Sequence, residues 1–545
     1  MLIHKDYKAR VLVLFLCFFA LYLVIIIRLF LLQIYQKDFF KLLATQQHHV
    51  SVTLEPERAE ILDRRGALLA FNRDVPSAFI LPHEIHTAQK TESFLKKYYS
   101  DVYKRMKKHP ERHFLWLERK LTPERFAWFQ KFNLDDIKFI QEFQRFYPYK
   151  ELANIIGFTD VDNKGIAGIE REYCNRLRGK PTHFMLNKDA RSTNLYFDKH
   201  VIDMGARGIS VTLTIDNKLQ FLAHEYLKEA IDEFQAQAGA VLVMDPETGE
   251  VIVMANYPTF DPNGKVPDDL EKTKNIIVSE CFELGSVMKV FAAMAVLEEG
   301  AVGFDEEIDC GGRVEYIDHF KVENWKNLEV LPFYNVISNS SNIGIAKVIK
   351  RIDKKYYDHL LNFGFGKKTG LVFSGERDGF VNNPRNWSRS SAIVMSFGYE
   401  ISATLLQLGV AMSMIANGGY LVKPVLVKED KSYKRNVARK KIYSDKTIAQ
   451  VKQILEIVGA KYATIAGYRT MGKTGTARMV VNGRYSNEKH LYTFAGIIEK
   501  DDFKRVVITF IKEPALRKRL WASDVAAPLY KRIAEKLVVH DVFNN

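Results

Sequence analysis

Cysteine is scarce in this sequence, with four among 545 residues. One of them, Cys17, lies inside a long apolar run, so Cys174, Cys281 and Cys310 remain for the rest of the chain. Three cysteines cannot build a disulfide framework, although one pair among them stays open. Internal repeats and low-complexity segments are lacking too. The fold therefore depends on packed cores, and a chain of this length is expected to form two or more units.

Spacings typical of metal ligands are also missing. His83 and His86 are three residues apart, whereas the zinc-binding helical motif places its two histidines four apart. His48 and His49 are adjacent and point in different directions from any regular element. We interpret all four as surface residues and expect no metal site.

Basic motifs with interleaved aromatic residues are lacking as well, although the net charge is +14. Lysine and arginine are spread along the whole chain, whereas a nucleic-acid groove gathers them on one face. The charge therefore favours a basic surface that meets anionic lipid or cell-wall polymer, and we expect no nucleic-acid partner. Hydrophobic residues make up 47% and charged residues 26%, a balance that excludes a disordered or fibrous chain.

One long apolar run is present near the N-terminus. Val11–Ile27 is an unbroken stretch of seventeen apolar residues, and Leu29–Leu32 extends it beyond Arg28. This length is enough to cross a bilayer core of about 30 Å, and no small-residue cleavage site follows it. Because cationic residues mark the cytoplasmic side, the sequence predicts a short cytoplasmic tail and export of everything that follows. The cations before the run are Lys5, Lys8 and Arg10.

Strand patterns occur on both sides of a long segment with helical spacing. Val211–Asp216 alternates, and Ala240–Met244 and Val251–Ala255 are β-rich runs separated by a Pro-Glu-Thr-Gly turn. Three further strands are predicted near the C-terminus, the first two joined by an Asn-Gly turn: Thr476–Val481, Leu491–Ile498 and Arg505–Ile511.

Helical spacing covers Lys218–Phe234, most of Glu280–Asn417, and Ser523–Val539. Strands at both ends with helices inserted between them predict an α+β domain. Its antiparallel sheet is built from distant parts of the chain.

The tetrad Ser286-Val-Met-Lys289 opens one of these predicted helices. Residues three apart share a helical face, so the Lys289 amine is expected one turn from the Ser286 hydroxyl. A serine becomes a nucleophile when a base takes its proton, and lysine is a base only when neutral. Burial and a second nearby cation lower a lysine pKa and supply that neutral form.

Two further motifs follow at gaps of about fifty and one hundred thirty residues. Ser338-Asn-Ser-Ser-Asn342 precedes the helical stretch Ile343–Ile352 and is by itself typical of a capped helix start. Gly472-Lys-Thr-Gly-Thr476 leads a β-rich hairpin, where a strand glycine indicates close approach of another backbone or a ligand.

The second of these motifs also matches a phosphate-binding loop. Gly467–Thr474 reads G-x-x-x-x-G-K-T, but such a loop must open a helix whose N-terminus holds phosphate. Here a β-branched, alternating stretch and a hairpin turn follow instead. We therefore reject a nucleotide-binding site and expect no cofactor.

The order S-x-x-K, S-x-N, K-T-G resembles the penicillin-binding proteins and serine β-lactamases. Over nearly the whole chain the sequence is similar to class B penicillin-binding proteins, and two stretches resemble their non-catalytic pedestal: Pro56–Ala70 and Gly157–Glu170. Four segments are most similar to the division-specific FtsI type: Gly467–Arg469, Lys473–Arg478, Gly483–Tyr485 and Ala526–Pro528.

The resemblance implies a fold and a domain plan. It predicts a cytoplasmic tail (1–10), a transmembrane anchor (11–32), an elongated pedestal of the dimerisation type (33–205) and a transpeptidase domain (206–545). The last is expected to hold a central antiparallel sheet flanked by helices, as in serine β-lactamases. The chain departs from the family at Ala59, at Leu284 before Gly-Ser, at Glu400 in a Gly-Tyr-Gly loop, and in Thr404–Gln407.

The resemblance also implies residue roles. Ser286 is expected to form an acyl-enzyme with the stem peptide of peptidoglycan and to release D-alanine, with Lys289 as base. Ser340 is expected to relay a proton, and Asn342 to hold Lys289 and the substrate amide. Lys473 is expected to supply positive potential. Thr474, Gly475 and Thr476 are expected to bind substrate, and the backbone N–H groups of Ser286 and Thr476 to form the oxyanion hole.

The implied function is a serine D,D-transpeptidase that cross-links stem peptides in septal wall synthesis, at the inner membrane, and that β-lactams inhibit. The expected partners are the peptidoglycan strand, other division proteins and a membrane glycan polymerase of the SEDS family (FtsW type). Three alternatives remain: a wall-elongation transpeptidase, a β-lactamase, and a non-catalytic penicillin-binding sensor or scaffold.

Overall fold

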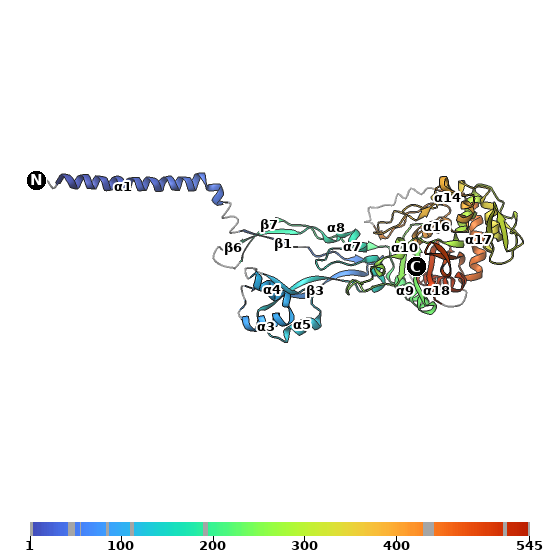
Figure 1. The fold of residues 1–545 in the computed structure, drawn as a ribbon, viewed down its shortest axis with the longest axis horizontal. Helices are drawn as coiled ribbons and strands as arrows, with labels where there is room; N and C mark the ends of the chain where they lie inside the picture. Colours follow the sequence, from blue (N-terminus) through green and yellow to red (C-terminus); the bar gives the residue numbers. More distant parts are fainter. Residues whose placement is uncertain are drawn as a thin grey trace. The chain divides into compact units, whose positions relative to one another are not determined.

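The computed structural model describes residues 4–41, 49–54, 56–82, 85, 87–109, 114–188, 195–428, 441–515 and 520–542 (Figure 1). The chain forms two compact units. One comprises Met1–Glu57 with Arg178–Gly208, and the other comprises Arg58–Leu177 with Ile209–Asn545. Among the expected non-ligand histidines, His48, His83 and His86 lie outside the described residues.

The first unit contains the predicted apolar span. Helix α1 (His4–Phe30) continues into a π-helical turn, η1 (Leu31–Tyr35). Within them Tyr7–Tyr35 is long and apolar enough to cross a membrane. A three-stranded antiparallel sheet in the order β1-β6-β7 completes the unit, with bounds His49–Leu54, Thr182–Lys188 and Leu195–Asp203.

The second unit is built on a five-stranded antiparallel sheet in the order β10-β9-β20-β19-β18. Its central strand β20 pairs with β9, which lies far away in the sequence, with Val507 opposite Val243. The sheet therefore joins distant parts of the chain, as predicted. The bounds are β9 Ala236–Met244, β10 Val251–Tyr257, β18 Arg469–Val481, β19 Arg484–Lys500 and β20 Phe503–Pro514.

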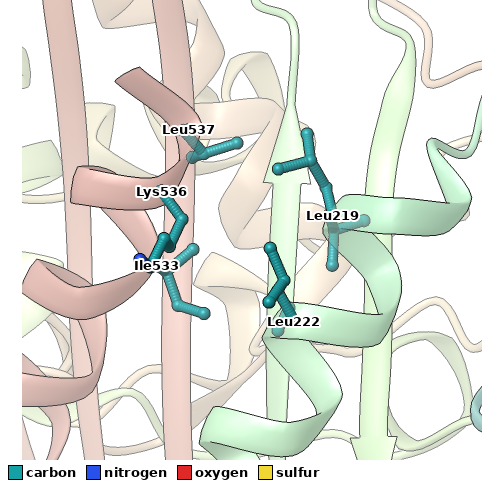
Figure 2. A pocket seen from close by; sticks show the side chains of 7 residues that line it. Leu219, Leu222, Ile533, Lys536 and Leu537 are labelled. Atoms are coloured by element: carbon teal, nitrogen blue, oxygen red, sulfur yellow. The ribbon is translucent and has the colours of Figure 1, made fainter. Parts of the chain in front are cut away.

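Both faces of this sheet are covered, which explains why its strands are apolar runs instead of clean alternations. Val241 and Val243 pack in a cluster with helices α9 (Asn217–Phe234) and α18 (Ala522–Val542). Leu242 and Met244 face the opposite side and pack with the helices inserted between β10 and β18. A small apolar gap between α9 and α18, lined by Leu219 and Ile533 among others, lies within the first of these clusters (Figure 2).

The inserted region is less helical than predicted. Its helices are α10 (Ile276–Ser279), α11 (Met288–Glu298), α12 (Phe333–Ser338), α13 (Asn342–Ile349), α14 (Lys355–Asn362), α15 (Ser391–Ser396), α16 (Leu405–Ala416) and α17 (Asp445–Tyr462). Three antiparallel strand pairs lie among them, β11–β14, β12–β13 and β15–β16. These strands have two to four residues each, too short to show a period of two in the sequence.

Those short strands have the bounds β11 Glu307–Asp309, β12 Val314–Ile317, β13 Phe320–Glu323, β14 Val330–Pro332, β15 Phe380–Val381 and β16 Ile401–Ser402. The predicted strand Val211–Asp216 is also shorter than expected, because β8 ends at Leu213. Asp216 instead caps α9, accepting hydrogen bonds from the N–H groups of Lys218 and Leu219.

A second sheet in this unit has six strands, five of which precede α9 in the sequence. β3 (Leu68–Ile80) pairs with β2 (Ile61–Leu62), β4 (Leu115–Glu118) and β5 (Ile137–Phe146), and β2 continues through β8 (Val211–Leu213) to β17 (Val427–Lys428). Helices α3 (Ala88–Tyr98), α4 (Ser100–Lys108) and α5 (Pro123–Gln130) accompany it. This sheet joins strands from before and after residue 205, so it does not separate the predicted pedestal (33–205) from the predicted transpeptidase domain (206–545). The boundary at residue 205 stays a prediction.

Candidate active site

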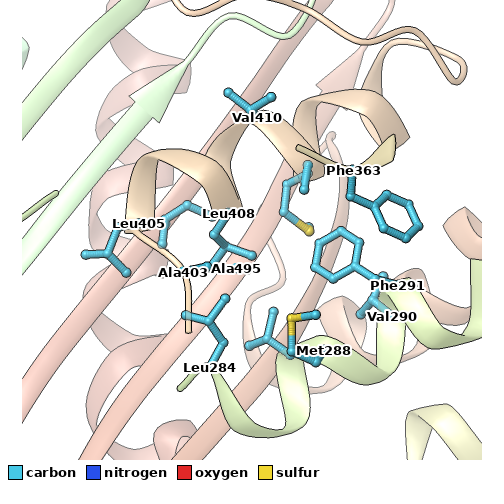
Figure 3. Packing of buried hydrophobic residues seen from close by; sticks show 14 of the residues in the cluster. Leu284, Met288, Val290, Phe291, Phe363, Ala403, Leu405, Leu408, Val410 and Ala495 are labelled. Atoms are coloured by element: carbon cyan, nitrogen blue, oxygen red, sulfur yellow. The ribbon is translucent and has the colours of Figure 1, made fainter. Parts of the chain in front are cut away.

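The predicted nucleophile lies in a tight turn that leads into a fully buried helix. Gly285–Val287 forms a 3₁₀ turn, and α11 continues from Met288. Every residue from Met288 to Leu297 is buried, which is the pattern of a helix covered on all sides. Figure 3 shows side chains of α11 meeting those of α16, with Ala495 of β19 close by. The apolar surroundings of Lys289 follow from this packing.

Two lysines and two serines meet at the start of this helix. Lys289 Nζ lies 3.1 Å from Ser286 Oγ, 3.0 Å from Ser340 Oγ and 2.8 Å from the Ser340 carbonyl oxygen. Lys473 Nζ lies 3.2 Å from Ser340 Oγ and 3.1 Å from the carbonyl oxygen of Thr474. The hydroxyl of Ser340 is therefore the common neighbour of both amines, and the three motifs converge as the sequence predicted.

Burial governs the charge state of these lysines. Lys289 is 0% exposed and Lys473 is 1% exposed. Burial, followed by the positive charge of Lys473, lowers the pKa of Lys289 well below its usual value. Burial also lowers the pKa of Lys473, to about 7. Since none of the described carboxylates forms an ion pair with either lysine, a neutral amine is favoured next to Ser286.

The loop that carries Ser340 joins α12 to α13 in a strained conformation. Ser340 has a φ of 58°, in the left-handed region that side chains other than glycine rarely adopt. Ser341 then caps α13 by accepting a hydrogen bond from the N–H of Gly344 at 3.0 Å. The expected capped helix start is confirmed. The backbone conformation of Ser340 just before it directs the Ser340 side chain toward the two lysines.

Asn342 differs from expectation. Its side-chain amide donates to the carbonyl oxygen of Glu323 at 2.6 Å, whereas the sequence analysis expected it to hold Lys289. The three hydrogen-bond contacts of the Lys289 amine go to Ser286 and Ser340. Asn342 is the first residue of α13, so it lies beyond the turn that brings Ser340 to the amine.

Strand β18 supplies the opposite wall. A side chain at Gly475 would place its Cβ 2.6 Å from Val287 Cγ2 and 2.7 Å from the Leu284 carbonyl oxygen, so only glycine lets this strand lie against the nucleophile turn. Gly475 therefore has a packing role beside its expected substrate contact. Thr474 and Thr476 are partly exposed, and Thr476 Oγ1 accepts a hydrogen bond from the N–H of Ala522 at 3.2 Å. Lys473 lies inside a strand that begins at Arg469, so the rejection of a phosphate-binding loop is confirmed.

A polar cluster beside the nucleophile was not found from the sequence. Glu283 Oε1 accepts hydrogen bonds from the Tyr485 hydroxyl at 3.0 Å and from the N–H of Glu400 at 3.1 Å. Burial raises the pKa of Glu283. Glu400, the residue that departs from the Gly-Tyr-Gly pattern, has a φ of 55°, which explains why glycine suits this position. In the sequence, the only sign of this cluster was the glutamate at position 400, where the family pattern has glycine.

The described residues offer this site neither a disulfide nor a cluster of metal ligands. The four cysteines are free, so the open possibility of one disulfide is not realised. No group of three or more histidine, cysteine, aspartate or glutamate residues suited to a metal ion occurs among the described residues.

Comparisons with known proteins agree with this geometry. Residues 239–535 match the penicillin-binding protein transpeptidase domain, and residues 53–203 match the penicillin-binding protein dimerisation domain. The probable peptidoglycan D,D-transpeptidase PenA of Neisseria meningitidis is 30% identical, over 88% of this chain and 84% of the relative. The peptidoglycan D,D-transpeptidase FtsI of Escherichia coli is 29% identical, over 87% of this chain and 82% of the relative.

Solved structures show the same architecture. Penicillin-binding protein 3 of Mycobacterium tuberculosis in complex with aztreonam superimposes with a TM-score of 0.68 at 26% identity, covering 90% of this chain and 97% of that one. A peptidoglycan synthetase from Bifidobacterium adolescentis superimposes with a TM-score of 0.71 at 21% identity, covering 90% and 96%, and supports the fold alone. With both domain matches in place, the chain belongs to the class B penicillin-binding proteins of the FtsI type, in which a dimerisation domain precedes a transpeptidase domain.

Proposed function

We propose that this protein is a serine peptidoglycan D,D-transpeptidase that cross-links stem peptides through an acyl-enzyme and is inhibited by β-lactams. The observation that carries the proposal is a serine hydroxyl 3.1 Å from a buried amine whose pKa is lowered well below its usual value. The names of the relatives, which are peptidoglycan D,D-transpeptidases, support the choice of substrate.

In the first half-reaction Ser286 Oγ attacks the carbonyl carbon of the penultimate D-alanine, and its proton passes to neutral Lys289. The developing oxyanion is stabilised by the backbone N–H groups of Ser286 and Thr476, where loss of one donor typically costs about 3 kcal/mol of barrier. Collapse of the tetrahedral intermediate breaks the peptide bond. The Ser340 hydroxyl, which lies 3.0 Å from Lys289 Nζ, relays a proton to the departing D-alanine amine.

In the second half-reaction the amine of a neighbouring stem peptide attacks the ester and restores Ser286. Before the first half-reaction releases D-alanine, Lys473, with Thr474 and Thr476, binds the terminal carboxylate of the donor. Because the pKa of Lys473 is about 7, an approaching carboxylate stabilises its charged form and raises that pKa. The same carboxylate is present in penicillins, which places a β-lactam carbonyl at Ser286. Asn342 is assigned to the substrate amide.

Replacement of the nucleophile tests the proposal. Ser286→Ala is expected to abolish covalent labelling by a fluorescent penicillin, because it removes the hydroxyl that attacks the β-lactam carbonyl, whereas the Ser340 hydroxyl lies between the two lysine amines and is assigned to proton relay. Ser413→Ala, a buried serine whose hydroxyl donates to the Gly409 carbonyl oxygen at 2.8 Å, is the matched control and is expected to label normally. Retained labelling of Ser286→Ala would overturn the assignment of the nucleophile.

The place of action belongs to the same proposal. The apolar helix α1 is the single membrane anchor, with the N-terminus in the cytoplasm and the catalytic domain outside the inner membrane. The matched ranges support a pedestal over residues 33–205 and a transpeptidase domain over 206–545. FtsI-type relatives favour septal synthesis with a SEDS-family polymerase (FtsW type) and other division proteins as partners.

Localisation of a tagged chain tests the division role: the expected outcome is a signal at midcell during constriction, and uniform side-wall localisation would favour the elongation role.

Failure of Ser286→Ala to restore growth would exclude a purely structural role as sensor or scaffold. A single turnover of a chromogenic cephalosporin per protein would exclude a β-lactamase.

A further inference from the structure

A segment outside the three motifs braces the loop that carries Ser340. Strand β13 ends at Glu323, and Asn324 and Trp325 follow it directly. The hairpin formed by β12 and β13 brings these residues against the start of α13, although they precede it in the sequence by many positions. Asn324 is 4% exposed, so its side-chain amide must find its partners inside the protein.

The Asn324 side chain is saturated with hydrogen bonds. Its Oδ1 accepts from the Asn342 N–H at 2.8 Å, the Ser341 hydroxyl at 3.1 Å and the Ile343 N–H at 3.2 Å. Its Nδ2 donates to the carbonyl oxygens of Gly312 at 2.9 Å and Cys310 at 3.0 Å. Exchange of the oxygen and nitrogen would bring donors against donors and acceptors against acceptors, so the network fixes the orientation of this amide.

The neighbours of Asn324 hold the same loop on either side. The Trp325 indole N–H donates to the carbonyl oxygen of Asn339 at 3.0 Å, one residue before Ser340. The Glu323 carbonyl oxygen accepts the side-chain amide of Asn342 at 2.6 Å, two residues after it. Three consecutive residues therefore contact the loop before and after Ser340.

Ser340 needs such support because its own backbone is strained. A non-glycine residue in the left-handed region persists only where the surroundings determine its conformation. In this conformation Ser340 Oγ lies 3.0 Å from Lys289 Nζ and 3.2 Å from Lys473 Nζ. Reacting groups misplaced by about 1 Å lose on the order of a hundredfold in rate.

We infer that Asn324 is a positioning residue of the acyl-transfer site, which holds the Ser340 hydroxyl between the two lysine amines through its hydrogen bonds to residues 341–343. The inference rests on the proposed function, because it assigns Asn324 a role in the rate of acylation. Asn324 itself touches no reacting atom, and its effect passes through Ser340.

The test uses the full-length chain in detergent and a fluorescent penicillin. Asn324→Leu removes all five hydrogen bonds at nearly constant volume, and Asn324→Asp keeps the acceptor but loses the two donors. Asn417→Leu is the control. Asn417 is 8% exposed, and its side-chain amide forms hydrogen bonds to the backbone of Pro246 and Tyr420, away from the candidate active site. The end point of labelling gives the fraction of competent protein, and the time course gives the limiting acylation rate and the half-saturating concentration.

The limiting rate per competent site is expected to fall about 10- to 100-fold in Asn324→Leu, with an intermediate loss in Asn324→Asp. The half-saturating concentration is expected to change less than the rate, because the carboxylate-binding residues lie on β18 and do not contact Asn324, whereas only Asn342 among the proposed substrate contacts is hydrogen-bonded to it. Asn417→Leu is expected to lose thermal stability and competent fraction but to keep its rate.

A normal limiting rate in either Asn324 variant would overturn the inference, and so would an equal loss in Asn417→Leu. The rate is normalised to competent protein, so partial unfolding does not lower it. If Asn324→Leu does not fold at all, the rate of Asn324→Asp decides whether the inference holds. An unlabelled wild type would instead overturn the proposed function itself.

Discussion

Two buried clusters of cations in the second unit have opposite chemistry. At the candidate active site Lys289 and Lys473 face one serine hydroxyl, and the described carboxylates form no ion pair with them. In the other cluster Arg58 and Arg145 face Glu170, with Nε to carboxylate distances of 2.6 Å on each side. Both clusters are almost fully buried.

The difference separates stability from function. The Glu170 carboxylate pairs with both guanidiniums and reduces the buried net charge of this cluster to one positive unit, and it joins residue 58 to residues 145 and 170 in the pedestal part of the chain. A hydroxyl between two amines compensates nothing, so burial drives the amines toward their neutral form. A neutral amine is what a general base requires, and the cost in stability is borne by the rest of the fold.

Removal of the proposed base has the largest expected effect. Lys289→Met keeps the volume of the side chain but removes the amine that takes the Ser286 proton, so the acylation rate is expected to fall about 10³-fold. The melting temperature is expected to stay equal or to rise, because an uncompensated buried amine is lost. Acylation kinetics with a fluorescent penicillin and a thermal melt measure both. Loss of stability together with activity would mean that the two clusters do not differ as described.

The opposite result is expected for the pedestal cluster. Glu170→Gln leaves two buried guanidiniums without a counter-charge, which is expected to cost about 3–5 kcal/mol of unfolding free energy. Denaturant unfolding measures the loss. The acylation rate per competent site is expected to stay within about twofold of the wild type, and a large fall in that rate would show that this cluster also acts on the active site.

Lys473→Met tests the charge of the second amine through the pH dependence of stability. The folded pKa of about 7 lies below the value of about 10.5 for a free lysine, so between these pH values the unfolded chain binds the extra proton. This residue therefore makes folding more favourable as pH rises through that window. The gain in melting temperature of Lys473→Met over the wild type is expected to be several °C at pH 6.5 and to shrink toward pH 10. A gain that does not change with pH would contradict a lowered pKa.

The smallest effect is expected at an exposed ion pair, which serves as the reference for the effects of substitutions in the two buried clusters. Lys107 Nζ lies 2.7 Å from Glu92 Oε1, and the two side chains are 52% and 33% exposed. Lys107→Ala is expected to leave the melting temperature and the acylation rate unchanged, because solvent screens such pairs. A shift as large as that of Glu170→Gln would show that burial does not explain the comparison.

Local patterns predicted the elements that position the nucleophile, and contacts between distant residues escaped them. Helical spacing places Lys289 one turn after Ser286, and the alternation after Lys473 predicts a strand, so both can be read within a few residues. The partner of Asn342 is Glu323, and that of Glu283 is Tyr485. Nothing in the spacing of these residues indicates their meeting, because loops and hairpins of irregular length bring them together.

The same limit applies to burial and to short elements. The sequence requires an uncharged Lys289 for catalysis, but its full burial depends on α11 being covered on every side. The strands β11–β16 are too short for a period to be visible, so the inserted region was expected to be more uniformly helical than it is. Asn324 follows one of these strands, which is why it was not found among the site residues.

Peptide mapping by mass spectrometry, after incubation of the full-length protein with benzylpenicillin, tests the central claim most directly. The account predicts one penicilloyl group per chain, on the peptide that contains Ser286. An adduct on any other residue, or no adduct on folded protein, would contradict it.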